Sequence, residues 1–172
     1  MKAIILCAGL GTRTGLEYPK CLYKFKNGST LLEKNLETLK RVGFKNSDII
    51  FVTGFKSSLI KKKTKNLYSY VHNRNFKITN MVFSFYEVIK KYHFHNYYIF
   101  YADIIFKTDI IKKLIRSNKK ISTLIDTDWL KKWKKKKNYL EDLEELIIKK
   151  NRIISLGKKT KNLKKIEGRF VG

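Results

Sequence analysis

A glycine-rich segment near the start of the chain has the composition of a phosphate-binding loop. Gly9-Leu10-Gly11-Thr12-Arg13 directly follows the apolar residues 3–7. Glycines let backbone amides approach phosphate oxygens closely, and Arg13 adds a planar, permanently charged guanidinium group. The dinucleotide fingerprint requires a glycine at position 14, where the chain has Thr, and the Gly-Lys-Ser/Thr ending of a P-loop is missing too. The segment therefore predicts phosphate contacts of another kind, with a simple glycine turn as the alternative.

Two further residues, Lys20 and Asp103, could act on the same phosphates. Lys20 follows the only proline of the chain, Pro19, whose restricted backbone would aim the lysine toward a phosphate held by the preceding loop. Asp103 comes just after the apolar residues 97–101. A carboxylate at the carboxyl end of a strand in an open α/β sheet suits a hard cation such as Mg²⁺. The alternative is that Asp103 caps the next turn.

Other residue types that often carry chemistry have simpler explanations here. His93 and His95 have no third metal ligand nearby, which favours surface histidines over a zinc site. Trp129 and Trp133 are spaced to pack on one helix face rather than to stack on bases. We find no local support for a Ser/His/Asp or Cys/His catalytic group.

The elements that must position these residues alternate along the chain. We expect strands at residues 3–7, 48–53, 68–71, 97–101 and 121–125. Helices are expected at residues 30–43, after Gly54, at 79–92 and at 109–117. Thr30 with Glu33 fits a capping box at the start of the first helix, and Thr79 is the expected cap of the third helix. This alternation predicts an α/β fold with a mostly parallel sheet flanked by helices. Residues 145–148 and 152–156 predict a C-terminal hairpin.

The charge of the chain raises the question of nucleic-acid binding. Its 172 residues fit one domain and carry a net charge of +25. Only six of the 39 basic residues are Arg, the residue that reads bases best, and the lysines are spread over several expected helices, with runs at 61–63 and 134–137. A solvated basic surface is the preferred interpretation, and a basic nucleic-acid-binding domain is the alternative.

The sequence also indicates where in the cell the protein is expected. It has no run of eighteen apolar residues, and Met1-Lys2 leads directly into the first strand, so we expect no membrane span, no signal peptide and a cytoplasmic location. The two cysteines, Cys7 and Cys21, are expected to be reduced thiols.

Taken in order, these motifs resemble the nucleoside-diphosphate-sugar pyrophosphorylase-like nucleotidyltransferases, which share a Rossmann-like fold. Residues 3–13 followed by Pro19-Lys20-Cys21-Leu22 resemble the signature of that superfamily. Thr79-Asn80-Met81-Val82 with Ser84, and the stretch 126–172, resemble the cytidylyltransferase branch that makes CDP-choline-type and 2-aminoethylphosphonate-type products. The resemblance covers essentially the whole chain.

The resemblance implies transfer of CMP from CTP to a small phosphorylated or phosphonate acceptor, with release of pyrophosphate. It places Arg13 and Lys20 on the phosphates, Asn80 and Ser84 near the base or ribose, and Asp103 on Mg²⁺. The loop residues that it assigns to nucleotide binding are Ala8, Gly9, Leu10, Gly11 and Thr12. An acceptor phosphate is already anionic, so alignment and charge neutralisation suffice and no general base is needed.

Some features depart from the family pattern. Only five residues separate Arg13 from Pro19, so the loop over the triphosphate is short, and the lysines at 134–137 replace an arginine of the relatives. The second metal-binding Asp of the family lies beyond Gly172, so residues 1–172 are expected to form a nucleotidyltransferase domain without the C-terminal portion of the family fold. The alternatives are a sugar-1-phosphate transferase using UTP or dTTP and a non-catalytic homologue. The acceptor and the oligomeric state, including a homodimer, stay open.

Overall fold

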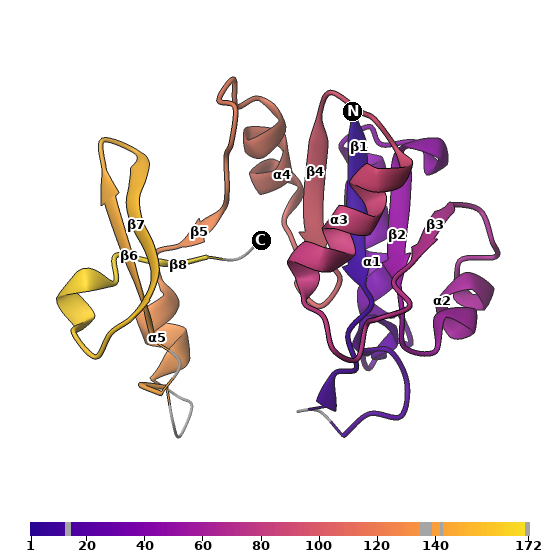
Figure 1. Cartoon of the computed structure of the whole chain (residues 1–172), viewed down its shortest axis with the longest axis horizontal. Helices are drawn as coiled ribbons and strands as arrows, with labels where there is room; N and C mark the ends of the chain where they lie inside the picture. Colours follow the sequence, from indigo (N-terminus) through magenta and orange to yellow (C-terminus); the bar gives the residue numbers. More distant parts are fainter. Residues whose placement is uncertain (13–14, 135–138, 142, 171–172) are drawn as a thin grey trace. The chain divides into compact units, whose positions relative to one another are not determined.

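The computed structural model describes residues 1–12, 15–134, 139–141 and 143–170. They form two compact units, Met1–Ser117 and Asn118–Gly172, which are shown in Figure 1. Within the described residues, no helix is long and apolar enough to cross a membrane.

A four-stranded parallel sheet forms the centre of the first unit. Its strands are β1 (Lys2–Cys7), β2 (Ile49–Thr53), β3 (Ser69–His72) and β4 (Tyr97–Tyr101). Their order is β3-β2-β1-β4, and Ile4 of β1 lies between Ile50 of β2 and Ile99 of β4. The structure therefore confirms the mostly parallel sheet and four of the five expected strands.

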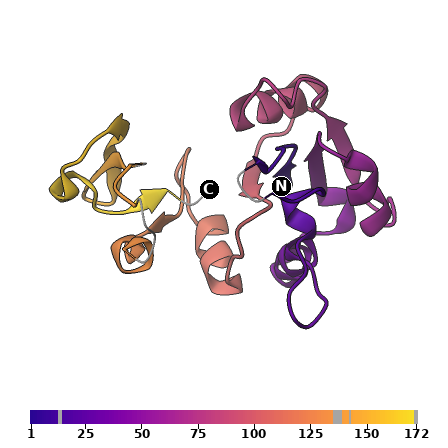
Figure 2. The same ribbon diagram turned by 90° about the horizontal axis from the view of Figure 1, so that it is seen from below.

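Helices cover both faces of this sheet, as near-continuous apolar strands require. Among the described residues of this unit, the α-helices are α1 (Leu31–Arg41), α2 (Ser57–Lys63), α3 (Met81–Lys91) and α4 (Thr108–Ile115). Val88 of α3 packs on Ile4, Ile50 and Val52, and α1 lies on the opposite side of the sheet (Figure 2). Two short 3-10 helices, η2 (Lys20–Leu22) and η3 (Asn46–Asp48), connect these elements.

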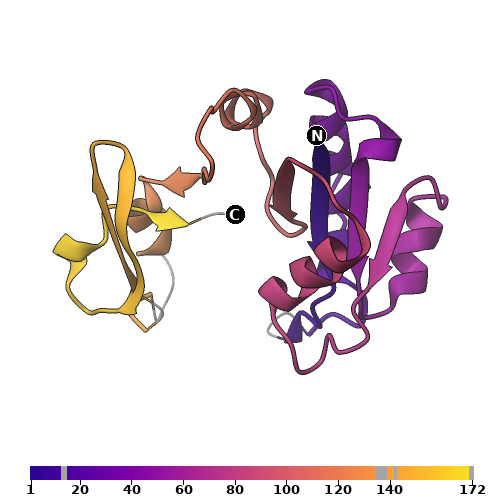
Figure 3. The ribbon, with the colours of Figure 1, turned by 45° about the horizontal axis from the view of Figure 1, so that its top comes forward.

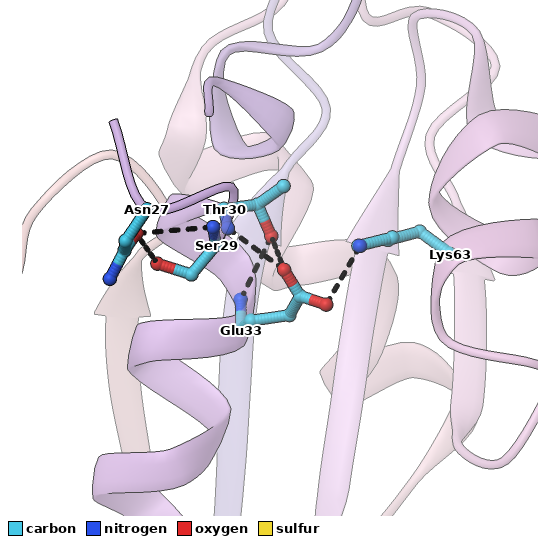
Figure 4. Close-up of polar contacts among 5 residues, drawn as sticks. All are labelled: Asn27, Ser29, Thr30, Glu33 and Lys63. Carbon is cyan, nitrogen blue, oxygen red and sulfur yellow. Dashed lines mark hydrogen bonds and ion pairs between the residues drawn. The ribbon is translucent and has the colours of Figure 1, made fainter. Parts of the chain in front are cut away.

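The start of α1 is fixed by the predicted capping box, which Figure 4 shows. The Thr30 hydroxyl oxygen accepts from the Glu33 backbone N–H at 3.2 Å, and the Glu33 carboxylate accepts from the Thr30 backbone N–H at 2.8 Å. The second carboxylate oxygen of Glu33 pairs with Lys63 of α2 at 2.7 Å. The start of α1 is thus joined to the end of α2.

Two expectations about element boundaries are wrong. The cap of α3 is Asn80 and not Thr79, because the Asn80 side chain accepts from the Phe83 N–H at 3.1 Å. The expected strand at 121–125 is reduced to β5 (Ile125–Asp126), which pairs antiparallel with β8 (Arg169–Phe170). Residues 121–125 include β-branched residues, which favour an extended backbone. However, Ile121 is 92% exposed, so this segment has no buried face that would hold it in a sheet.

The second unit contains the expected C-terminal hairpin, which can be followed in Figure 3. Strands β6 (Glu144–Lys149) and β7 (Arg152–Lys159) pair antiparallel, and Lys150 and Asn151 between them both have positive φ, as a type I′ turn requires. Helix α5 (Trp129–Trp133) packs Trp129 into a small core with Leu143 and Ile166, and Trp133 packs against it. The packing role predicted for the tryptophans is confirmed. A 3-10 helix, η4 (Leu163–Lys165), lies between β7 and β8.

Candidate active site

A cavity of about 410 Å³ opens at the carboxyl ends of β1 and β4. The chain leaves β1 toward β2 and β3 on one side, whereas β4 lies on the other side, so the strand order reverses between β1 and β4. Ligands of open α/β sheets bind at such a reversal, outside the carboxyl ends of the strands. The volume is in the range of small-molecule sites.

The cavity brings together most of the residues that the sequence singles out. Its lining includes Ala8, Gly9, Gly11, Lys20, Asn80, Ser84 and Asp103. Leu10 and Thr12 belong to the same loop but are not among the described residues that line the cavity. Arg13 lies outside the described residues, so its predicted role stays a prediction.

The loop after β1 is held in shape by backbone contacts. Gly11 has a φ of +64°, a left-handed conformation that favours glycine. The carbonyl oxygen of Ala8 accepts from the Phe55 N–H at 3.1 Å. A Cβ on Gly54 would lie 2.6 Å from that same oxygen and 2.6 Å from Phe76, so only glycine fits there. Sequence reasoning missed that Gly54 allows the end of β2 to approach the loop.

Lys20 and Asp103 meet at the cavity. The Lys20 Nζ lies 2.7 Å from Asp103 Oδ2, and the two side chains are 41% and 40% exposed. Lys20 opens η2, whose first turn is closed by the Leu22 N–H donating to the Pro19 carbonyl at 2.8 Å. An ion pair as exposed as this contributes only about 0–1 kcal/mol after solvent screening. A bound phosphate could take the place of Asp103 as the partner of Lys20, and a metal ion could take the place of Lys20 as the partner of Asp103. Either exchange would cost little free energy.

Asp103 fits a magnesium ion that arrives with a polyphosphate. Mg²⁺ takes one or two protein carboxylates and fills its other positions with phosphate oxygens and water. Among the residues that the structure describes, no group of three or more His, Cys, Asp and Glu could hold a metal ion. A single carboxylate leaves the other positions of the ion to phosphate oxygens and water, which suits a metal–nucleotide complex. His93 and His95 are both exposed, as the sequence suggested.

The start of α3 forms another wall of the cavity. Asn80 and Ser84 both line it, but the side-chain oxygen of Asn80 is occupied by the helix cap. Behind them lies Asn73, which is 1% exposed and donates to the hydroxyls of Thr79 at 2.9 Å and Ser84 at 3.0 Å. Sequence reasoning missed Asn73. Its position directly after β3 was the only available signal.

Two cysteines and a tyrosine, Cys7, Cys21 and Tyr101, also line the cavity. Cys7 and Cys21 are free and buried. Burial raises the pKa of the Cys7 thiol well above its usual value, and contact with Cys21 and the charge of Asp103 act in the same direction. Burial, followed by the charge of Asp103, also raises the pKa of Tyr101. Both groups are therefore neutral near pH 7, and Cys7 is poorly suited to nucleophilic chemistry.

The basic run at 61–63 lies on the first unit. All three lysines are exposed, as expected for a solvated face, but Lys63 is engaged with Glu33. Most of the other run, at 135–137, lies outside the described residues.

Comparison with known proteins agrees with this geometry. The family model of the MobA-like NTP transferase domain matches residues 3–135. The CTP:phosphoglutamine cytidylyltransferase of Campylobacter jejuni is 33% identical in an alignment covering 100% of this chain and 71% of that protein.

Solved structures show the same fold at lower identity. The inositol-1-phosphate CTP transferase of T. maritima superimposes with a TM-score of 0.66 at 19% identity, over 92% of this chain and 64% of that one. The CTP:phosphocholine cytidylyltransferase of Streptococcus pneumoniae gives a TM-score of 0.62 at 23% identity, over 90% of this chain and 63% of that one. The chain thus spans less than two thirds of these two structures.

Proposed function

Because the chain belongs to the MobA-like NTP transferase domain family, we propose that it transfers CMP from CTP to a small phosphorylated or phosphonate acceptor and releases pyrophosphate. The observation that carries the proposal is the meeting of Lys20 and Asp103, 2.7 Å apart, on a cavity that Gly9 and Gly11 also line. A phosphate-binding loop, a cation and a metal-binding carboxylate are the three parts that nucleotidyl transfer needs. The name of the Campylobacter relative supports CTP as the donor and a phosphorylated molecule as the acceptor.

In the proposed reaction an oxygen of the acceptor phosphate forms a bond to the α-phosphorus of CTP. The bond from that phosphorus to the bridging oxygen breaks, and pyrophosphate leaves. Backbone amides of the loop that contains Gly9 and Gly11 would hold phosphate oxygens, and Lys20 would neutralise charge on the leaving pyrophosphate. Asp103 would hold Mg²⁺, which when bound supplies further neutralisation of the phosphates. Arg13 is proposed to act beside Lys20.

Residues 1–172 would serve as a nucleotidyltransferase domain in a cytoplasmic enzyme. The chain spans 71% of the Campylobacter protein, so the activity of the whole protein, its acceptor and any homodimer are also proposals.

The test is nucleotide preference, measured on the full-length gene product. Calorimetry with CTP, UTP, ATP and GTP, each with Mg²⁺, should show the tightest binding for CTP. Pyrophosphate release should then require an acceptor phosphate or phosphonate. Preference for UTP, with turnover of a sugar 1-phosphate, would favour the sugar-nucleotide alternative. Equal, weak binding of all four nucleotides that disappears with added salt would leave only charge attraction and would contradict the proposal.

A further inference from the structure

A partly buried hydrogen-bond network lies behind the part of the cavity that is lined by the start of α3. At its centre is Asn73, the residue after β3, whose backbone N–H donates to the Thr53 carbonyl of β2 at 2.8 Å. This bond fixes the backbone of Asn73 relative to the sheet. The side chain of Asn73 is therefore presented to α3 from a rigid position.

The orientation of the Asn73 side-chain amide follows from one backbone group. The N–H of Asn75 donates to Asn73 Oδ1 at 2.9 Å. A backbone amide can only donate, so that atom of Asn73 must be the oxygen, and the amide nitrogen must lie on the other side. The two hydrogens of Nδ2 are directed to the hydroxyl oxygens of Thr79, at 2.9 Å, and Ser84, at 3.0 Å.

The two hydroxyl groups that accept from Asn73 use their own hydrogens differently. The Thr79 hydroxyl donates to the Asn75 carbonyl at 2.8 Å, so its hydrogen is committed inside the network. Ser84 also accepts from Asn73, and within the described residues Asn73 is the hydrogen-bond partner of its hydroxyl. Ser84 lines the cavity. Its hydrogen is therefore left to donate to a ligand there.

We propose that Asn73 is a positioning residue that fixes the Ser84 hydroxyl as a hydrogen-bond donor toward the nucleobase, and so selects cytosine over uracil. The two pyrimidines differ at ring position N3, which is an acceptor in cytosine and carries a hydrogen in uracil. A fixed donor facing N3 pairs with cytosine, whereas with uracil it meets a second donor. The inference rests on the proposed function, since it assumes a pyrimidine nucleotide in this cavity.

The substitution Asn73→Asp reverses the network. An aspartate still accepts from the Asn75 N–H, but it accepts from Ser84 instead of donating to it. The Ser84 hydroxyl then turns its hydrogen inward and presents a lone pair to the base. The added negative charge weakens the binding of every nucleotide triphosphate, so the quantity to follow is the ratio of the UTP and CTP dissociation constants.

Calorimetry on the full-length protein with Mg²⁺–CTP and Mg²⁺–UTP measures this ratio. We expect Asn73→Asp to lower it by about 10-fold or more, as for a lost hydrogen bond facing a buried polar group. Asn75→Ala is the matched control, because Asn75 acts through its backbone and the ratio should stay unchanged. In a Ser84→Ala background, Asn73→Asp should produce no further change in the ratio, since the hydroxyl through which it acts is gone.

The outcomes separate the two proposals. If wild-type protein binds CTP and UTP equally, the proposed nucleotide is wrong and the inference fails with it. If wild-type protein prefers CTP and folded Asn73→Asp keeps the same ratio, the inference alone is overturned. Should Asn73→Asp fail to fold, Ser84→Ala decides the question: an unchanged ratio in that variant refutes the role of the hydroxyl, and a ratio lowered to a similar extent supports it.

Discussion

The ammonium group of Lys20 lies 2.7 Å from the carboxylate of Asp103, although the two residues are 83 positions apart in the chain. Each side chain is about two fifths exposed, so the pair is held by geometry more than by a large free energy. The contact places one charge suited to phosphate beside one suited to a metal ion. In the proposed reaction, a metal–triphosphate complex would separate the pair and bind to both partners.

The substitution Asp103→Asn tests the metal-binding side of this pair. The amide keeps the shape and loses the charge, so we expect Mg²⁺-dependent pyrophosphate release to fall by at least about 100-fold. The melting temperature should change little, because the ion pair is exposed. The matched control is Asp109→Asn, on the first turn of α4. Full activity of Asp103→Asn would remove this residue from the mechanism, and a large drop in melting temperature would favour a structural role.

A second prediction concerns acid stability and the start of α1. The ion pair with Lys63 and the bonds with Thr30 lower the pKa of Glu33 to about 2. A lowered folded-state pKa stabilises the fold above the unfolded value, near 4.5, and this stabilisation is lost as the pH falls from there toward 2. Because Glu33 is partly exposed, solvent screening limits the effect to roughly 1 kcal/mol.

Urea unfolding of wild-type protein and Glu33→Gln between pH 7 and pH 3 measures this effect. The difference in unfolding free energy should be largest at pH 7 and should shrink below about pH 4.5. Glu37→Gln, whose carboxylate pairs with Arg41 on the surface of α1, is the control. A difference that stayed constant with pH would show that the carboxylate charge of Glu33 is not its source.

A third prediction uses Cys7. The raised pKa of Cys7 keeps its thiol protonated at pH 8. Because iodoacetamide reacts with thiolates, it should label Cys7 more slowly at this pH than it labels a thiol with an ordinary pKa. The rate should still increase above pH 9, where an ordinary thiol is already largely ionised. Mass spectrometry of the labelled peptide, with and without Mg²⁺–CTP, measures the rate and should show protection by the nucleotide. Fast labelling of Cys7 at pH 7 would contradict the assignment.

The fourth prediction separates the transferase from a nucleic-acid binder. Arg13→Ala should lower turnover at least about 100-fold, because it would remove the charge-assisted bonds to the phosphates that we propose for this residue. The combined change of Lys61 and Lys62 to Gln should leave turnover nearly unchanged and weaken non-specific binding of DNA, with a shallower dependence on salt. Lys63 is kept, because it pairs with Glu33. If Arg13→Ala were silent, and the two lysines governed a tight, sequence-dependent complex with DNA, the transferase proposal would be wrong.

Sequence reasoning found the elements whose signals are local. Strands β1, β2 and β4 are near-continuous apolar runs, the Thr30–Glu33 box spans four residues, and the hairpin depends on a turn at Lys150 and Asn151. Residues 121–125 carried the same apolar signal, but whether an extended segment joins a sheet depends on partners far along the chain. This information is not in the segment itself.

The same distinction applies to the site. Gly9, Lys20 and Asp103 could be predicted because each stands next to a recognisable strand end or proline. Asn73 could not, since its role depends on hydrogen bonds with residues six and eleven positions later that only the packed start of α3 brings within reach. Asn80 lines the cavity as expected, but its cap bond was missed because Thr79 offers an equally good capping residue one position earlier.

The strand order β3-β2-β1-β4 has a consequence for synthesis on the ribosome. β1 is made first but lies between β2 and β4, so one of its edges stays unpaired until Tyr97–Tyr101 has been translated. At roughly 5–20 residues per second, that edge waits about 5–20 s in the cell. During this interval the growing chain carries an open, strongly apolar strand edge, which is the kind of surface that chaperones bind and that misassembles with other nascent chains.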